Sequence, residues 1–203
     1  MKFIDYLRQK KKDQILHNLL LLGNQSERQA KFTTLQNEIS IDFNTKVLGV
    51  TSIGEDKIAA GFAKALADTY VANGSSALII DANLYSPCLG ELLGKDAKGD
   101  EPSVEKFNDK SGFVSLNKEI YPSTVYKAGK VHKLIEEGIK EYEHVIVLVP
   151  SIDIHKEVAL LADILDSVLL LSIRGITKKK DIFYALQFLY GEKLPVSKTV
   201  ILK

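Results

Sequence analysis

The segment Lys46–Ala60, KVLGVTSIGEDKIAA, constrains the fold more than any other part of the chain. Its first half is a continuous apolar run, which is typical of a strand buried on both faces of a sheet. A glycine turn and a helical pattern follow directly. In this order, a strand, a glycine turn and a helix form a place where phosphate groups can be bound. The segment therefore predicts a layered α/β fold with a phosphate-binding type of turn.

The same alternation of apolar runs and helical patterns continues through the rest of the chain. It predicts an α/β domain of three layers, with a mostly parallel central sheet, helices on both faces and right-handed crossovers. The expected strands are Val47–Thr51, Ala77–Ile80, Val145–Val149, Val168–Ile173 and a short edge strand at Lys198–Leu202. The expected helices are Ile58–Tyr70, Val131–Tyr142, Val158–Leu165 and Lys179–Leu189.

Two regions depart from this alternation. Residues 94–112 are polar and rich in glycine, which predicts a mobile surface loop. Residues 1–45 predict an N-terminal helical extension to the domain at 46–203, with helices at Phe3–Leu22 and Ser26–Ile39. The first helix carries a basic cluster at residues 8–12 and a leucine-rich second half. It is expected to pack on the sheet or on a partner subunit; the alternative is a basic amphipathic helix that contacts an anionic membrane.

Composition limits the classes of partner and compartment. With 27 Lys and Arg against 26 Asp and Glu, the net charge of +1 provides no overall field that attracts nucleic acid. The single cysteine, Cys88, cannot form an internal disulfide, which favours the cytoplasm. It lacks an activating histidine and is expected to be a buried, inert thiol. The longest apolar runs, Val145–Pro150 and Val168–Leu171, are too short to cross a bilayer, so the protein is expected to be soluble or peripheral at the inner face of the cell membrane.

The turn after the first expected strand keeps only part of a phosphate-binding loop. Gly54 and Lys57 suit the binding of phosphate oxygens, and Glu55 lies between them. Asp56 places a carboxylate where phosphate would need a positive backbone, and Coulomb repulsion opposes binding there. Ile58 stands where a serine or threonine would hold Mg²⁺, and it has no oxygen to offer.

Further charged residues follow two later strands. Asp81 ends the expected strand in ALIIDANLYSP and would face the same crevice, since ligands of such sheets bind at the carboxyl ends of the strands. Each candidate also has a structural interpretation. Asp81 can cap its own turn, Lys57 can be a solvated residue in the first turn of a helix, and Arg174 can be an exposed loop arginine. The four histidines have no metal-ligand spacing, and no metal site is predicted.

Taken together, the motifs resemble a known family. The order strand, GEDK and helix, then IIDANLYSP, then a strand ending in VPS, then ADILDSVLLLSIRGITKKKDI resembles the bacterial tyrosine kinases of capsule and exopolysaccharide synthesis. These kinases belong to the P-loop ATPases that include MinD-like and ParA-like proteins. The resemblance covers residues 26–192. It implies a P-loop NTPase-like fold and, if the site functions, ATP or ADP with Mg²⁺ bound at Gly54, Glu55, Asp56, Lys57 and Ile58, with Arg174 near the nucleotide.

The departures from the family pattern predict a protein without its chemistry. Asp56 replaces a glycine, Ile58 and Ala59 replace a Ser-Thr pair, and Asn83 replaces a second acid. Leu148 stands where the family has the aspartate that orders Mg²⁺. Phosphoryl transfer depends on positioning and on Mg²⁺, so these losses predict a degenerate ATPase in which Lys57 and Asp81 are vestigial, no residue is assigned as catalytic and no cofactor is expected.

Such a protein would act by binding other proteins. The resemblance implies a scaffold or regulator whose partners are a membrane polysaccharide co-polymerase or an active kinase paralogue, with homo-oligomers also expected and no nucleic acid. Two alternatives stay open. One is an active ATP-binding kinase or ATPase with a rearranged site built from Lys57, Asp56 and Asp81. The other is a MinD-like or ParA-like positioning protein that uses its basic N-terminal helix on a membrane or on nucleic acid.

Overall fold

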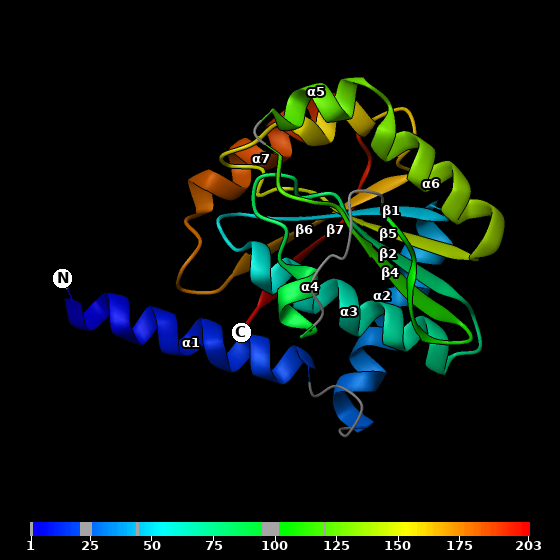
Figure 1. The fold of residues 1–203 in the computed structure, drawn as a ribbon. Helices are drawn as coiled ribbons and strands as arrows, with labels where there is room; N and C mark the ends of the chain where they lie inside the picture. Colours follow the sequence, from blue (N-terminus) through cyan, green and yellow to red (C-terminus); the bar gives the residue numbers. More distant parts are fainter. Residues whose placement is uncertain (1, 21–25, 44, 95–101, 120) are drawn as a thin grey trace.

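The architecture is a seven-stranded sheet between two layers of helices (Figure 1). The computed structural model describes residues 2–20, 26–43, 45–94, 102–119 and 121–203. The strand order is β3-β4-β2-β5-β1-β6-β7. Neighbouring strands are parallel except for the antiparallel pair β3 and β4. The strands are β1 (Val47–Ser52), β2 (Ala77–Asp81), β3 (Glu105–Asn108), β4 (Ser111–Ser115), β5 (His144–Leu148), β6 (Ser167–Ile173) and β7 (Val196–Leu202).

The predicted fold class is confirmed, because the apolar runs form the centre of the sheet. Every residue of β1, β2 and β6 is buried, as expected for parallel strands covered on both faces. The prediction of a loop over residues 94–112 is wrong for its described second half. There, β3 and the start of β4 form a hairpin at one edge of the sheet, and β3 alternates half-buried and exposed side chains. Residues 95–101 lie outside the described part of the chain.

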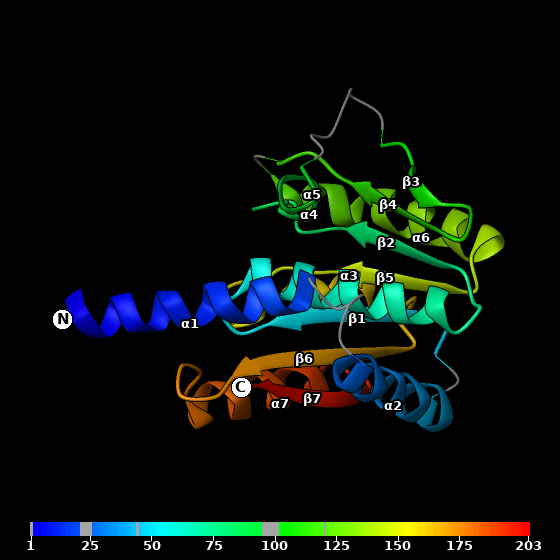
Figure 2. The same cartoon turned by 90° about the horizontal axis from the view of Figure 1, so that it is seen from below.

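The helices cover the two faces of the sheet, as the view in Figure 2 shows. One apolar cluster joins the sheet to α1 (Lys2–Leu20), α2 (Ser26–Phe43), α3 (Asp56–Ala72) and α4 (Leu89–Leu92). The cluster on the opposite face involves α5 (Pro122–Lys127), α6 (Lys130–Glu141), η2 (Glu157–Leu161) and α7 (Lys179–Gly191). The expected α-helix at Val158–Leu165 is wrong in type and extent, because η2 is a short 3-10 helix that ends at Leu161.

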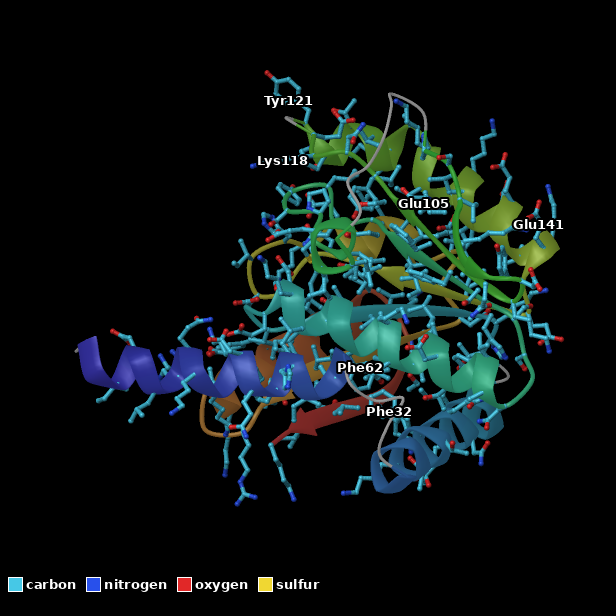
Figure 3. The ribbon with its side chains drawn as sticks, turned by 60° about the horizontal axis from the view of Figure 1, so that its bottom comes forward. Phe32, Phe62, Glu105, Lys118, Tyr121 and Glu141 are labelled. Atoms are coloured by element: carbon cyan, nitrogen blue, oxygen red, sulfur yellow. The ribbon has the colours of Figure 1, made fainter. Side chains whose placement is uncertain are left out.

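The two N-terminal helices pack on α3. Ile15 and Leu19 of α1 are buried in the core, and Gly61 of α3 admits the close approach of Leu16, since a Cβ there would lie 2.7 Å from a Leu16 methyl group. On α2, the ring of Phe32 lies 4.9 Å from that of Phe62 (Figure 3). Both helices therefore pack on the domain through α3, whereas the first helix was expected to pack on the sheet or on a partner subunit. The division into an extension at 1–45 and a domain at 46–203 stays a prediction.

The first half of α1 differs from its second half. It extends beyond the body of the domain at the end where the strands β1 and β6 finish (Figures 1 and 2). Ile4 and Leu7 are accordingly 57% and 47% exposed. None of the helices within the described residues combines the length and the apolar character that crossing a membrane requires.

Candidate functional site

The candidate site lies where the parallel strands end. Because parallel strands bring their carboxyl ends to one edge of the sheet, the turns that follow them are neighbours. The sequence-predicted residues Gly54 to Ile58 lie after β1, Asp81 is the last residue of β2, and Arg174 follows β6. A fourth turn, which follows β5 and contains Ser151 and Asp153, completes this edge.

The turn after β1 is closed by oxygens of the protein itself. The backbone N–H of Gly54 donates to Asp153 Oδ1 at 2.9 Å, and that of Glu55 donates to Ser52 Oγ at 3.2 Å. Gly54 has φ = +73°, a conformation that glycine adopts without steric cost. Such turn N–H groups are the donors that hold phosphate oxygens in a phosphate-binding loop. Here a carboxylate and a hydroxyl group occupy two of them.

Asp56 joins this turn to the turn after β5. Its Oδ1 accepts hydrogen bonds from the backbone N–H of Ser151 at 3.0 Å and from Ser151 Oγ at 2.6 Å. Ser151 Oγ also lies 3.1 Å from Ser52 Oγ. The Asp56 carboxylate therefore links two turns that are 95 residues apart in the sequence.

Lys12 of helix α1 contacts the turn after β1. Lys12 forms an ion pair with Glu55, and both side chains are largely buried. Burial raises the pKa of Glu55 above its ordinary value, and the hydrogen bond and charge of Lys12 partly oppose that rise. The pair therefore holds an acidic side chain against the first helix, away from bulk water.

Lys57 lies on the outside of the turn. Its ammonium group contacts Glu91 of α4 at 2.7 Å, and 57% of its side chain and 67% of that of Glu91 are exposed. The hydrogen bond to Glu91 raises the pKa of Lys57. This is the solvated first-turn position that the sequence leaves open as an alternative to a phosphate-binding role.

Asp81 is fully buried and caps the turn that follows β2. Its Oδ2 accepts the backbone N–H groups of Cys88 at 2.9 Å and Leu89 at 2.8 Å, and its Oδ1 accepts that of Asn83 at 3.2 Å. Desolvation raises the pKa of Asp81 to about 6, although the three N–H donors lower it. The carboxyl group is therefore occupied in holding its own turn together.

Cys88 is buried, as expected from the sequence. It is 3% exposed, and burial, followed by the nearby charge of Asp81, raises the pKa of its thiol far above the ordinary value. A neutral thiol is a poor nucleophile.

The two positions at which the family would hold Mg²⁺ are part of the apolar core. Ile58 and Leu148 are each 3% exposed and belong to the same buried cluster. Neither side chain has an oxygen. Within the described residues, no three His, Cys, Asp or Glu side chains are placed to hold a metal ion together.

Arg174 lies on the exposed turn between β6 and α7. Its carbonyl oxygen accepts a hydrogen bond from Lys11 Nζ at 2.5 Å, and its N–H donates to Leu202 O at 2.9 Å. The backbone of this residue thus connects the turn to α1 and β7.

A polar cluster surrounds Tyr85 in the turn after β2. Tyr85 donates to Glu157, which also accepts a hydrogen bond from Ser123 at 2.9 Å, and the ring of His155 stacks on Tyr85 at 3.6 Å. Burial alone would raise the pKa of Glu157, but these hydrogen bonds hold it below its ordinary value. The cluster therefore ties the turn after β2 to η2 and α5 with an ionised carboxylate.

Comparison with solved structures identifies the fold. The kinase domain of the Escherichia coli tyrosine kinase ETK superposes with a TM-score of 0.81 at 15% identity, over 91% of this chain and 79% of that chain. The chimerical protein CapA2B2 gives a TM-score of 0.80 at 16% identity, over 91% and 89% of the two chains. This chain has the fold of the bacterial tyrosine kinase domains. No protein-family model and no curated protein matches its sequence.

The fold is also similar to that of a solved ATPase outside the tyrosine kinases. A ParA family ATPase from Chlorobium tepidum TLS matches with a TM-score of 0.56 at 16% identity, over 77% of this chain and 72% of that chain. The resemblance read from the motif order is therefore confirmed at the level of the fold.

Sequence reasoning missed four residues of the site. Asp153 and Ser151, which bind the loop, and Lys12 and Glu91, which pair with it, come from other elements. One signal was present in the sequence, because an aspartate follows the VPS motif by two residues at the same edge of the sheet. The two ion pairs had no such signal.

Proposed function

We propose that this protein is a catalytically degenerate member of the tyrosine kinase fold that acts by binding proteins, as a scaffold or regulator of capsule or exopolysaccharide synthesis. One observation supports it most strongly. The turn that would hold the nucleotide phosphates is bound by the protein's own carboxylates, through Gly54 to Asp153 and through Asp56 to Ser151.

The charge of the turn argues against nucleotide chemistry. Two unit charges of the same sign about 4 Å apart repel by roughly 4 kcal/mol at an effective dielectric constant of about 20. A phosphate group in this turn would lie near the carboxylates of Asp56 and Asp153 and would have to displace Asp153 from the N–H of Gly54. The residues at the two magnesium positions, Ile58 and Leu148, supply no ligand, so this site does not fit a magnesium nucleotide.

Calorimetric titration with ATP and ADP, with and without Mg²⁺, tests the loss of nucleotide binding. We expect no heat of binding up to millimolar nucleotide. The double variant Asp56→Gly/Asp153→Ala removes both carboxylates and is expected to bind ATP more tightly than the wild type. Asp68→Ala/Asp163→Ala is the matched control, because it removes two exposed carboxylates away from the turn. Micromolar, Mg²⁺-dependent binding by the wild type would contradict the proposal.

Genetic complementation tests the binding role. In a strain that lacks the protein, capsule or exopolysaccharide output is expected to change, and Lys57→Met is expected to restore it as well as the wild type does. Failure of Lys57→Met alone to complement, together with ATP turnover that this substitution abolishes, would show an active enzyme instead.

The partners follow from the same proposal. A membrane polysaccharide co-polymerase or an active kinase paralogue is expected to bind one of the helical surfaces, and homo-oligomers are also expected. Co-purification of the tagged protein with either partner, unaffected by Asp56→Gly/Asp153→Ala, would support a scaffold whose binding does not require the phosphate turn.

A further inference from the structure

Basic residues from two distant segments meet at one end of the molecule. Segment 2–12 belongs to α1, and segment 174–181 contains the turn after β6 and the start of α7. Lys11 Nζ joins them through its hydrogen bond to the carbonyl oxygen of Arg174, and a Cβ at Gly175 would lie only 3.9 Å from the same ammonium group. The fold therefore combines two basic stretches that are about 160 residues apart in the sequence.

The charge of this end contrasts with that of the whole protein. The two segments hold nine basic residues and two acidic ones, Asp5 and Asp181, for a formal charge of +7, whereas the whole chain carries +1. The basic residues are Lys2, Arg8, Lys10, Lys11, Lys12, Arg174, Lys178, Lys179 and Lys180. The remainder of the chain therefore carries a formal charge of −6, and one of its acids, Glu55, is paired with Lys12.

Three lysines place positive charge at the N-terminus of α7, which is unfavourable for the helix. They are Lys178, Lys179 and Lys180. They cap and begin α7, where the helix dipole is positive and favours acidic side chains. All three are exposed, and within the described residues none of their ammonium groups lies in an ion pair. Their positive charge is therefore uncompensated, and it is available to an anionic partner.

Exposed apolar side chains accompany the basic ones on both helices. On α1, Ile4 and Leu7 are 57% and 47% exposed and lie four residues before Arg8 and Lys11, so each pair shares a helix face. On α7, Phe183 and Tyr184 are both 62% exposed and follow Lys179 and Lys180 at the same spacing. Figures 1 and 2 show the first half of α1 standing free of the sheet at this end.

We propose that this end of the molecule, which we call the basic surface, is a contact site for an anionic lipid membrane. Lysine and arginine attract acidic lipid headgroups, whereas aliphatic and aromatic side chains insert at the boundary between headgroups and acyl chains. The combination fits a lipid surface better than nucleic acid, whose backbone gives exposed aliphatic residues such as Ile4 and Leu7 no apolar layer to enter. The proposal does not depend on whether the phosphate turn binds nucleotide.

The sequence alone pointed only to the α1 half of this surface. Read along the chain, the basic face ended at residue 12, and Lys178–Lys180 belonged to a separate motif. The structure adds the second basic stretch and the exposed aromatic residues beside it.

Flotation of the full chain with lipid vesicles tests the proposal. Vesicles of phosphatidylcholine with about one third phosphatidylglycerol are compared with pure phosphatidylcholine at low and high salt. We expect binding to the anionic vesicles only, and its loss at high salt. Each lysine near an anionic surface contributes about fivefold in partitioning, so Lys178→Gln/Lys179→Gln/Lys180→Gln is expected to bind about 100-fold more weakly.

A matched variant separates a specific surface from general charge. Lys127→Gln/Lys130→Gln/Lys140→Gln removes the same charge from exposed positions on α5 and α6 and is expected to bind as the wild type does. Ile4→Ser/Leu7→Ser is expected to weaken binding to the anionic vesicles at low salt, because it removes apolar side chains that insert below the headgroups. Circular dichroism confirms that each variant is folded.

Three results would overturn the proposal. They are equal binding to neutral and anionic vesicles, equal loss in the two triple-lysine variants, and binding to duplex DNA without binding to anionic vesicles under the same conditions.

Discussion

In the turns after β1 and β2, a carboxylate accepts backbone N–H groups, but the first carboxylate is exposed and the second is buried. After β2, Asp81 is fully buried and holds Cys88 and Leu89 in its own turn. After β1, Asp153 lies on an exposed part of the neighbouring turn and reaches across to Gly54. The arrangement after β2 is part of the core, whereas that after β1 is a surface contact that water can replace.

The difference in burial determines which of these hydrogen bonds can change without loss of the fold. A buried acid cannot be removed cheaply, because the N–H groups that it satisfies have no access to water. Surface contacts cost little to change, so the turn after β1 can exchange a ligand for protein carboxylates.

The largest effect is expected from Asp81→Ala. It leaves the buried N–H groups of Cys88 and Leu89 without acceptors, at a cost of about 1 to 3 kcal/mol each. We therefore expect the free energy of unfolding to fall by about 3 kcal/mol at pH 4, where the carboxyl group of Asp81 contributes most to stability, measured by urea denaturation. Asp68→Ala, which removes an exposed acid paired with Lys64, is the control and is expected to cost less than about 0.5 kcal/mol. Equal effects of the two substitutions would remove the contrast between buried and exposed acids.

The pH dependence of the unfolding free energy tests the burial of Asp81 directly. The pKa of Asp81 rises from its ordinary value of 3.8 to about 6 in the folded protein, because burial disfavours the charged form. Its favourable contribution to stability is thus complete below pH 3.8 and is lost as the pH rises through about 6. Relative to wild type, Asp81→Asn is expected to gain roughly 2 kcal/mol in unfolding free energy between pH 4 and pH 7. A difference in unfolding free energy that does not change with pH would contradict this assignment.

A smaller effect is expected at the turn after β1. Asp153→Ala removes the acceptor of Gly54 N–H, which solvent can replace, so the cost in unfolding free energy is about 1 kcal/mol. The amide resonance of Gly54 in a nitrogen–proton NMR spectrum is expected to shift and to exchange faster with solvent. Asp163→Ala, an exposed acid near η2, is the control and leaves that resonance in place. An unchanged Gly54 resonance in Asp153→Ala would show that the hydrogen bond is absent in solution.

The smallest effect is expected from Lys57→Ala. The ion pair with Glu91 is exposed on both sides, and such pairs contribute about 0 to 1 kcal/mol. A double-mutant cycle with Glu91→Ala measures the coupling energy and is expected to give less than about 1 kcal/mol. A coupling that persists at high salt, or one of several kcal/mol, would place Lys57 in a desolvated site instead.

The sequence predicted most of the fold because apolar runs identify parallel strands. Val47–Thr51 and Val168–Ile173 fall within β1 and β6, each of which is one residue longer than predicted. The hairpin of β3 and β4 was missed since its first strand, EKFN, is short and exposes alternate residues at an edge. The helix expected at Val158–Leu165 was wrong because apolar spacing does not distinguish one tight 3-10 turn from the start of an α-helix.

The site was predictable only in part. Residues on the turn itself, such as Gly54 and Asp56, follow from the motif. Their partners do not, because Ser151 and Lys12 approach through the packing of separate elements. For the same reason, the sequence alone could not show that Asp81 binds its own turn and that Lys57 turns outward.

Because Cys88 is buried, the rate at which a thiol reagent labels it can be used to measure how often the protein opens around it. A thiol reagent can reach this sulfur only when the turn after β2 opens and Asp81 releases the N–H of Cys88. With one cysteine in the whole chain, the labelling rate reports every opening that exposes this turn, from local opening to global unfolding. Opening at the candidate site can thus be followed in the wild-type protein without an introduced cysteine.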